Sequence, residues 1–125
     1  MSADFTLDEY QVKAHHTAVY KTDDTVAVGD PLDHDPVKQV PVYPFLKVAT
    51  EAAETSEKVI KVKYRGDFLF VPKRDLIKEL GDILWYVAEG ATILGVPLSE
   101  IALTNLDKLA ARAKTGAIKG HGDER

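Results

Sequence analysis

The sequence of 125 residues contains no cysteine. It therefore forms no disulfide and offers no thiolate for a zinc site or for nucleophilic catalysis. It also lacks an excess of positive charge, since 16 Lys and Arg against 20 Asp and Glu give a net charge of −4, so no broad basic surface is expected for a nucleic-acid polymer. No apolar run approaches the length of a membrane span, and residues 1–10 have no signal-peptide core. We therefore expect a soluble, intracellular protein that binds neither nucleic-acid polymers nor membranes.

Length and hydrophobic content predict one domain. At 125 residues, of which 45% are hydrophobic, the chain is long enough to bury a core of its own, so residues 1–125 are interpreted as a single domain. Within it, residues 22–44 combine four prolines and five aspartates with one glycine, a composition that blocks regular helix. We expect a long loop there, which would be either a substrate lid or a flexible insertion.

The remaining sequence has apolar residues at helical spacing and predicts four helices. Thr6 is a suitable N-cap for the first, with Glu9 completing a capping box. Pro97 suits the first position of the last helix, and Gly116 ends it. The predicted ranges are about 6–20, 45–63, 75–94 and 97–114. Together they predict an all-α bundle of about four helices. Because the third helix is apolar on a wide face, we expect dimerisation to complete the core.

Three further features of the sequence carry expectations. The connector 64–73 has a short apolar run that could form a brief hairpin or pack against a partner chain. Gly81 and Gly90 lie inside the third predicted helix, where glycine is unfavourable, and this predicts a close approach of another backbone. The tail, residues 115–125, has little apolar periodicity and is predicted to be mobile.

Two acidic pairs at helical spacing are the strongest functional signal. Residues three apart share a helix face, so if the second and third helices pack antiparallel, both pairs can point into one cleft. Like charges there would repel each other and favour a bound cation, and carboxylate-rich sites suit magnesium. A single Glu-x-x-Glu is more often a solvated surface pair, but the second pair lies within an apolar stripe, where unpaired carboxylates are costly. The four residues are Glu51, Glu54, Glu79 and Asp82.

Other polar residues could assist a phosphate ligand at this cleft. Tyr86 follows Asp82 by one turn and could stack on a base or hydrogen-bond a phosphate, although a core tyrosine is an equal alternative. The fourth helix carries a polar, cationic stripe, Asn105, Lys108 and Arg112, which suits polyphosphate, although an ordinary solvated face has the same appearance. The four histidines lack metal-ligand spacing, which disfavours zinc. The Glu-x-x-His motif of a di-iron bundle is also absent.

The order Glu-x-x-Glu, spacer, Glu-x-x-Asp resembles the motif of the MazG-type all-α nucleoside triphosphate pyrophosphohydrolases. The run 78–86 is similar to the metal-binding helix of this family, and residues 105–125 are similar to its C-terminal signature. The opening residues 7–11 are similar to small members, which are often encoded by bacteria or phages. The resemblance covers most of the chain and is weakest over residues 22–41.

This resemblance implies a magnesium-dependent hydrolase in the cytoplasm of a bacterial or phage-infected cell, with Mn²⁺ as an alternative ion. The substrate would be a nucleoside or deoxynucleoside triphosphate, converted to the monophosphate and pyrophosphate by water attack at the α-phosphorus. The active unit would be a homodimer or homotetramer. The implied metal ligands and catalytic residues are Glu51, Glu54, Glu79 and Asp82, one of the first pair also orienting the water. The implied substrate contacts are Gln11, Tyr86, Asn105, Lys108 and Arg112.

Two alternatives stay open from the sequence. The chain could be a relative of the dimeric dUTPases or of the phosphoribosyl-ATP pyrophosphohydrolases, which share the chemistry but not the substrate. It could also be a helical dimer without catalytic activity that senses nucleotides or binds a protein partner. Base and sugar preference, the number of metal ions and the choice between dimer and tetramer are not fixed by the residues.

Overall fold

The computed structural model describes residues 4–116. The elements follow one another as α1 (Leu7–His15), β1 (Thr25–Asp30), a 3-10 turn (Pro31–Asp33), β2 (Asp35–Pro41), α2 (Tyr43–Lys63), α3 (Lys73–Leu94) and α4 (Leu98–Thr115). The predicted helical fold is confirmed, since all four expected helices are present and α2, α3 and α4 begin and end close to their predicted limits.

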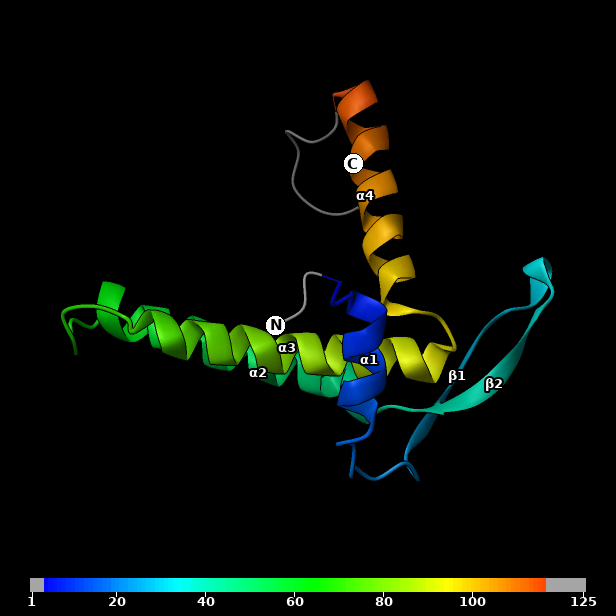
Figure 1. The fold of residues 1–125 in the computed structure, drawn as a ribbon, viewed down its shortest axis with the longest axis horizontal. Coiled ribbons are helices and arrows are strands. Elements are labelled where there is room, and N and C mark those ends of the chain that lie inside the picture. Colours follow the sequence, from blue (N-terminus) through cyan, green and yellow to red (C-terminus); the bar gives the residue numbers. More distant parts are fainter. Residues whose placement is uncertain (1–3, 117–125) are drawn as a thin grey trace.

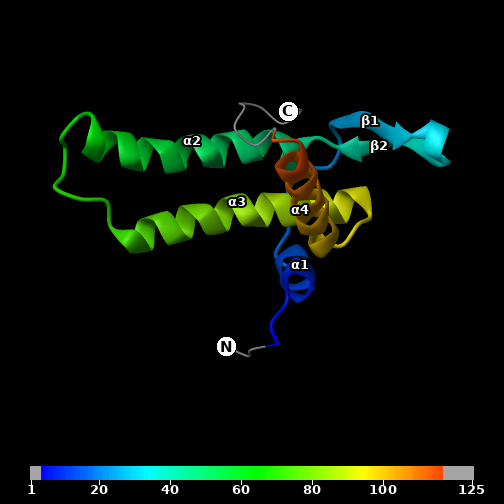
Figure 2. The same cartoon turned by 90° about the horizontal axis from the view of Figure 1, so that it is seen from above.

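The centre of the molecule is an antiparallel pair formed by α2 and α3, which lie side by side along their whole length (Figures 1 and 2). Gly95 ends α3 in the left-handed conformation, with φ of 74°, a value that glycine adopts readily. The chain then turns sharply, so that α4 is bent by 101° from α3. In Figure 1, α4 rises away from the pair and α1 crosses α3.

The first helix is shorter than the sequence predicts. The backbone N–H of Glu9 donates to the Thr6 hydroxyl at 3.1 Å, so the predicted N-cap is confirmed. At the other end, the predicted continuation to residue 20 is wrong, because α1 ends at His15. The Thr17 hydroxyl donates to the carbonyl of Ala14 at 2.7 Å, and it accepts a hydrogen bond from the Trp85 indole. Residues 17–20 are therefore used for contacts with α3.

The expected long loop at 22–44 is wrong over most of its length, because this segment contains an antiparallel hairpin of β1 and β2. Two of the prolines, Pro36 and Pro41, lie in β2, and both strands of a two-stranded sheet are edge strands, where proline is tolerated. At the irregularity after Val28, a Cβ on Gly29 would lie 2.6 Å from the Cα of Val37, so only glycine fits. The hairpin extends beyond the end of the helical pair (Figure 1).

Two other local expectations need correction. In the connector between α2 and α3 the hairpin is wrong, whereas packing against a partner chain stays a prediction, since Phe68, Leu69 and Phe70 are exposed. Among the described residues of the single chain, no backbone atom is nearest to a Cβ placed at Gly81 or Gly90. A Cβ on Gly81 would meet nothing within 4 Å, whereas one on Gly90 would lie 3.2 Å from the ring of Phe45, a side chain. The close approach is therefore aromatic packing at Gly90 alone.

The helices leave much apolar surface uncovered in the single chain. On α3, Ile77 and Leu80 are 60% and 56% exposed, and on α4 Leu103 and Leu106 are each 59% exposed. In the described part of the chain, no single helix is long and apolar enough to cross a bilayer, and only α3 and α4 taken together, across their sharp bend, pass such a test. The expected mobile tail lies almost entirely outside the described residues.

Candidate metal centre and adjoining aromatic cavity

Carboxylates from α2 and α3 meet between the two helices. Glu51 on α2 and Glu79 and Asp82 on α3 each offer one oxygen, and these three oxygens lie within 4.8 Å of one another. Glu51 is only 8% exposed, whereas Asp82 is exposed to solvent. The antiparallel packing thus brings three of the four predicted ligands into one group that is open on one side.

The fourth predicted ligand, Glu54, stands at the rim. It is exposed and makes a hydrogen bond with Glu51. The pKa of Glu51 is raised above its ordinary value of 4.5, first by burial, then by this hydrogen bond and by the charges of Glu54 and Asp82, while Lys47 opposes the shift. Without a cation, these surroundings therefore favour the protonated form of Glu51 more than water does.

Two lysines compensate this negative charge only in part. The Lys47 ammonium is 3.9 Å from Glu51, and that of Lys58 is 3.6 Å from Glu79, both long for ion pairs. The second oxygen of Glu79, Oε2, is buried and has no hydrogen-bond partner among the described residues. A buried carboxylate oxygen without a partner is costly. A set of hard oxygen donors with one unsatisfied fits a divalent cation such as Mg²⁺.

Two tyrosines adjoin the acidic cluster. Burial and the neighbouring charge of Asp82 raise the pKa of Tyr10, which lies on α1. Burial, a hydrogen bond with Tyr43 and nearby negative charge raise the pKa of Tyr86 to about 12. Tyr86 lines a cavity of about 350 Å³ together with Glu51, Asp82 and Trp85. The structure therefore places Tyr86 beside the cluster, as the sequence predicts.

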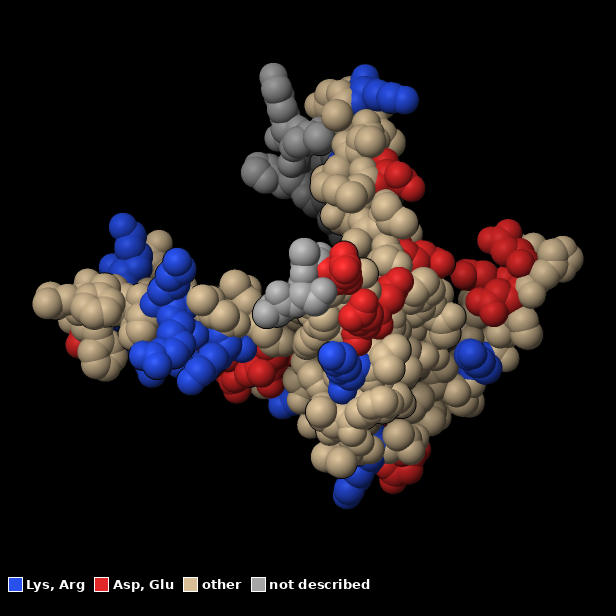
Figure 3. Space-filling view, in the orientation of Figure 1, with Lys and Arg blue, Asp and Glu red and all other residues tan. Residues whose placement is uncertain are grey.

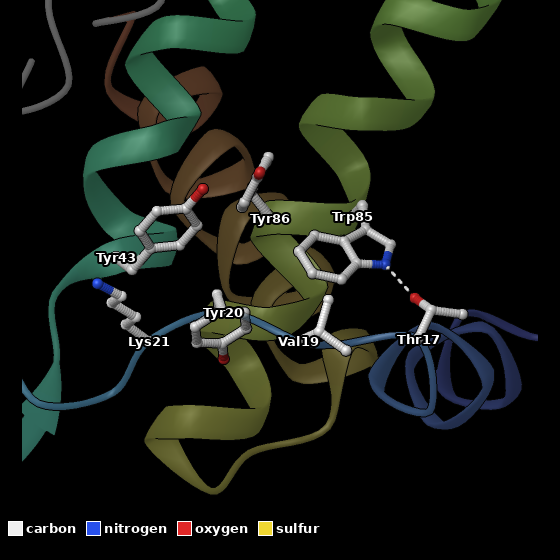
Figure 4. Close-up of a pocket in the computed structure, with 7 residues that line it drawn as sticks. All are labelled: Thr17, Val19, Tyr20, Lys21, Tyr43, Trp85 and Tyr86. Carbon is white, nitrogen blue, oxygen red and sulfur yellow. Dashed lines mark hydrogen bonds between the residues drawn. The ribbon is translucent and has the colours of Figure 1, made fainter.

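A second cavity of about 430 Å³ continues from the first and shares Trp85 and Tyr86 with it. Its walls are mainly aromatic (Figure 4). Tyr20 stacks on Tyr43 with ring centroids 5.4 Å apart, and Tyr20 also meets the edge of Trp85 at 6.2 Å. Flat apolar walls beside an anionic site suit a ligand with a ring at one end and metal-binding phosphates at the other. The other lining residues are Thr17, Val19 and Lys21.

Four predicted substrate contacts lie elsewhere in the single chain. The Gln11 amide donates to the Thr92 hydroxyl and the Val96 carbonyl, and its oxygen accepts from the N–H of Leu98, so it fastens α1 to the turn between α3 and α4. The stripe on α4 projects with that helix away from the α2 and α3 pair (Figure 1). Neither cavity at the cluster is lined by the stripe residues Asn105, Lys108 and Arg112.

Several residues at the site escaped the sequence analysis. Lys47 precedes Glu51 by one helical turn, a spacing that would have indicated it. Tyr20 and Tyr43 carry no local signal, because they flank the hairpin that the sequence did not predict.

Basic residues also gather over the arm where α2 ends and α3 begins (Figure 3). They include Lys61 and Lys63 in the last turn of α2, which would attract a polyanion to this side of the molecule.

Fold and site together define a class, that of helical proteins which gather carboxylates from two antiparallel helices beside an aromatic cavity. The sequence model of the family described as MazG nucleotide pyrophosphohydrolase domain matches residues 45–117, and the chain belongs to this family. It is also similar to the Gene 37 protein of Mycobacterium phage L5, with 36% identity over 121 residues that cover 95% of this chain and 98% of the relative. No solved structure matches the chain.

Proposed function

We propose that the protein is a magnesium-dependent pyrophosphohydrolase that converts a nucleoside or deoxynucleoside triphosphate into the monophosphate and pyrophosphate. The observation that carries this proposal is the convergence of Glu51, Glu79 and Asp82 next to a cavity with aromatic walls. The cluster suits phosphates that carry a divalent ion, and the cavity suits a base. Membership of the family supports the class of reaction.

In this proposal Glu51, Glu79 and Asp82, joined by Glu54 at the rim, hold Mg²⁺, with Mn²⁺ as the alternative ion. When bound, the ion neutralises charge on the phosphates and favours ionisation of water. Glu54 is exposed beside Glu51, so it can orient a water molecule and accept its proton. The water oxygen bonds to the α-phosphorus, the bond from this phosphorus to the bridging oxygen breaks, and pyrophosphate leaves.

The lysines beside the cluster have a second role in this proposal. Lys47 and Lys58 lie at long ion-pair distances from Glu51 and Glu79, so each can turn toward a phosphate oxygen at little cost. The Lys47 ammonium also lies 6.0 Å from the centre of the Tyr86 ring, which puts it between the acidic cluster and the aromatic cavity. Lys47 is thus well placed for the α-phosphate, where the reaction occurs.

We also propose that the active unit is a homodimer, which could pair again into a tetramer. The exposed apolar residues of α3 and α4 make a surface of the kind that oligomers cover. In such a dimer, α4 of the second copy would bring its polar stripe to the acidic cluster of the first. Light scattering coupled to size exclusion tests this, and a monomer at micromolar concentration would contradict it. The stripe residues concerned are Asn105, Lys108 and Arg112.

A substrate screen with product identification tests the reaction. The panel contains the common nucleoside and deoxynucleoside triphosphates, dUTP and phosphoribosyl-ATP, each with Mg²⁺ and with EDTA. We expect monophosphate and pyrophosphate only with Mg²⁺, and a loss of about 10²- to 10³-fold in rate for Asp82→Asn. Glu57→Gln is a matched control, because Glu57 is on the same helix as the first acidic pair but bonds Arg65.

The alternatives give different results in the same screen. Activity confined to dUTP or to phosphoribosyl-ATP would identify the narrower specificity, with the chemistry unchanged. Nucleotide binding in a calorimeter without product would support a sensing protein instead. Hydrolysis that persists in EDTA, or in Asp82→Asn, would contradict the role of the acidic cluster.

A further inference from the structure

Glu89 on α3 is a buried carboxylate that the proposed reaction does not use. It is 0% exposed and lines neither cavity at the cluster. A buried carboxylate is tolerated only when it accepts hydrogen bonds. The Tyr20 hydroxyl donates to its Oε1 at 2.8 Å, and Nδ1 of His15 lies 3.2 Å from its Oε2. Two side chains from the N-terminal segment therefore hold Glu89.

Tyr20 needs such an anchor because no regular element fixes it. It lies between α1 and β1, in a segment without helix or strand. Its ring forms one wall of the aromatic cavity, between Tyr43 and Trp85 (Figure 4). Ring contacts are weakly directional, whereas a hydrogen bond to a carboxylate fixes both distance and angle. The bond to Glu89 therefore sets where the ring of Tyr20 stands.

The same segment is fastened to α3 a second time. The indole nitrogen of Trp85 donates to the Thr17 hydroxyl at 2.9 Å. The chain from Thr17 to Tyr20 is thus held at both ends by side chains of α3, while Val19 between them is 98% exposed. This side of the cavity is built from a short exposed segment that depends on two side-chain hydrogen bonds, one of which is accepted by Glu89.

We propose that Glu89 is a positioning residue for the base: by holding Tyr20, it keeps the aromatic wall in place and sets the affinity for the nucleoside part of the substrate. Glu89 itself does not touch the substrate. This inference rests on the proposed function, since it assumes that the aromatic cavity takes the base. The acidic cluster, which binds the phosphates in that proposal, begins two turns away along α3 and does not include Glu89, so we expect the loss of Glu89 to change phosphate binding much less than base binding.

Three variants and one control separate positioning from a general structural role. Glu89→Leu removes the acceptor and keeps an apolar side chain of similar length. Glu89→Gln retains an oxygen that can accept from Tyr20, and Tyr20→Phe removes the donor but keeps the ring. Ser99→Ala is the matched control, because the Ser99 hydroxyl donates to Asp8 at 2.8 Å and links α1 to α4 away from the cavity.

Steady-state kinetics are measured with every nucleotide of the substrate screen, and magnesium-dependent binding is measured with inorganic tripolyphosphate, which has phosphates and no base. We expect Glu89→Leu and Tyr20→Phe each to raise KM for the preferred nucleotide by roughly tenfold, the equivalent of one hydrogen bond to a charged group. In Glu89→Leu, kcat and the tripolyphosphate affinity should change less than about twofold.

The variant that combines Glu89→Leu with Tyr20→Phe should have a KM no higher than that of either single variant, because both substitutions remove the same hydrogen bond. Glu89→Gln should restore most of the affinity, and Ser99→Ala should leave KM unchanged.

An unchanged KM in Glu89→Leu would overturn the inference, and so would an equal loss of nucleotide and tripolyphosphate affinity, which indicates a general loss of structure. Quenching of Trp85 fluorescence by the same nucleotides gives a readout without turnover. A wild-type protein that hydrolyses none of these nucleotides but shows quenching that Glu89→Leu weakens would contradict the proposed function and support the positioning role. A wild-type protein with neither turnover nor quenching would contradict both.

Discussion

Asp82 and Glu89 are carboxylates two turns apart on α3, and opposite kinds of group surround them. Glu89 is fully buried and faces hydrogen-bond donors, the hydroxyl of Tyr20 and the imidazole of His15. Asp82 is exposed and faces two further carboxylates. The more deeply buried group is therefore the one whose partners compensate it.

This difference separates a structural carboxylate from a ligand-binding one. Donors of the chain itself satisfy Glu89, so it needs no ion. At the acidic cluster, one oxygen of Glu79 has no partner among the described residues, and the two nearest ammonium groups are more than 3.5 Å from a carboxylate oxygen. Like charges at such distances raise the free energy of the folded state unless a cation joins them. Without a cation the cluster therefore lowers the stability of the folded protein, and the same repulsion favours the binding of a metal ion.

The largest expected effect is a loss of Mg²⁺ affinity when Asp82 is changed, with no such loss when Glu89 is changed. Asp82→Asn should weaken Mg²⁺ binding by at least about 100-fold, because it removes a direct ligand, and even outer-shell substitutions cost up to that much. Glu89→Gln should leave Mg²⁺ affinity unchanged, because Glu89 lies outside the cluster. Titration calorimetry with Mg²⁺ measures both. Equal losses in the two variants would show that the two carboxylates are not functionally distinct.

The next largest effect is a loss of stability, and it is expected at Glu89. Glu89→Ala should lower the free energy of unfolding by about 3 kcal/mol, because it leaves a cavity and removes the acceptor of a part-buried hydroxyl. Asp82→Ala should change it by less than about 0.5 kcal/mol in EDTA, since Asp82 is exposed. Urea denaturation of both variants gives the values. A larger loss at Asp82 would reverse the assignment of roles.

A smaller effect of opposite sign is expected at Glu79. In EDTA, Glu79→Gln should raise the free energy of unfolding by about 1 kcal/mol, because it removes one of the like charges of the cluster and keeps the size of the side chain. Mg²⁺ should then stabilise the variant less than the wild type. Glu57→Gln is the control, and its exposed pair with Arg65 should contribute no more than about 0.5 kcal/mol. Destabilisation by Glu79→Gln in EDTA would show that the cluster is already satisfied.

The comparison also shows what local sequence can predict. The acidic residues at spacing three and the N-cap at Thr6 depend on neighbours within one turn, and the structure confirms the N-cap and brings three of the four acidic residues together. The bond between Tyr20 and Glu89 joins residues 69 positions apart, and no periodicity indicates it. The hairpin was not predicted for a similar reason. The pairing of β1 with β2 depends on the register between two segments, and the prolines in this region indicated a loop instead.

The direction of α4 is the clearest limit of sequence reasoning here. Hydrophobic spacing predicts the helix but not its angle, which depends on the left-handed conformation of Gly95 and the extended conformation of Pro97. Helix α4 therefore leads away from α2 and α3, and its stripe lines neither cavity at the cluster in the single chain. Its predicted contact with phosphate stays a prediction that depends on a second copy. The residues concerned are Asn105, Lys108 and Arg112.

The smallest expected effect is a dependence of stability on pH that belongs to Glu51. Its pKa in the folded protein is raised above 4.5 by burial, the hydrogen bond with Glu54 and neighbouring negative charge. The folded state therefore binds a proton more tightly than the unfolded chain does. The resulting stabilisation is fully present below pH 4.5 in EDTA and is lost as the pH rises through the folded-state pKa. Since Mg²⁺ needs the ionised carboxylate, its stabilising effect should grow over the same range of pH.

Thermal unfolding of wild type and Glu51→Gln, across this range with EDTA and with Mg²⁺, isolates the contribution of Glu51 from that of other acids. The difference between the two proteins in EDTA should shift in favour of the variant as the pH rises, because the variant has no proton to lose. Glu54→Gln should reduce the slope without abolishing it, since it removes the charge of Glu54 while burial of Glu51 remains. A difference that does not change with pH would mean that Glu51 is already ionised in the folded protein without a cation, and that Lys47 compensates its charge more fully than the distance of 3.9 Å indicates.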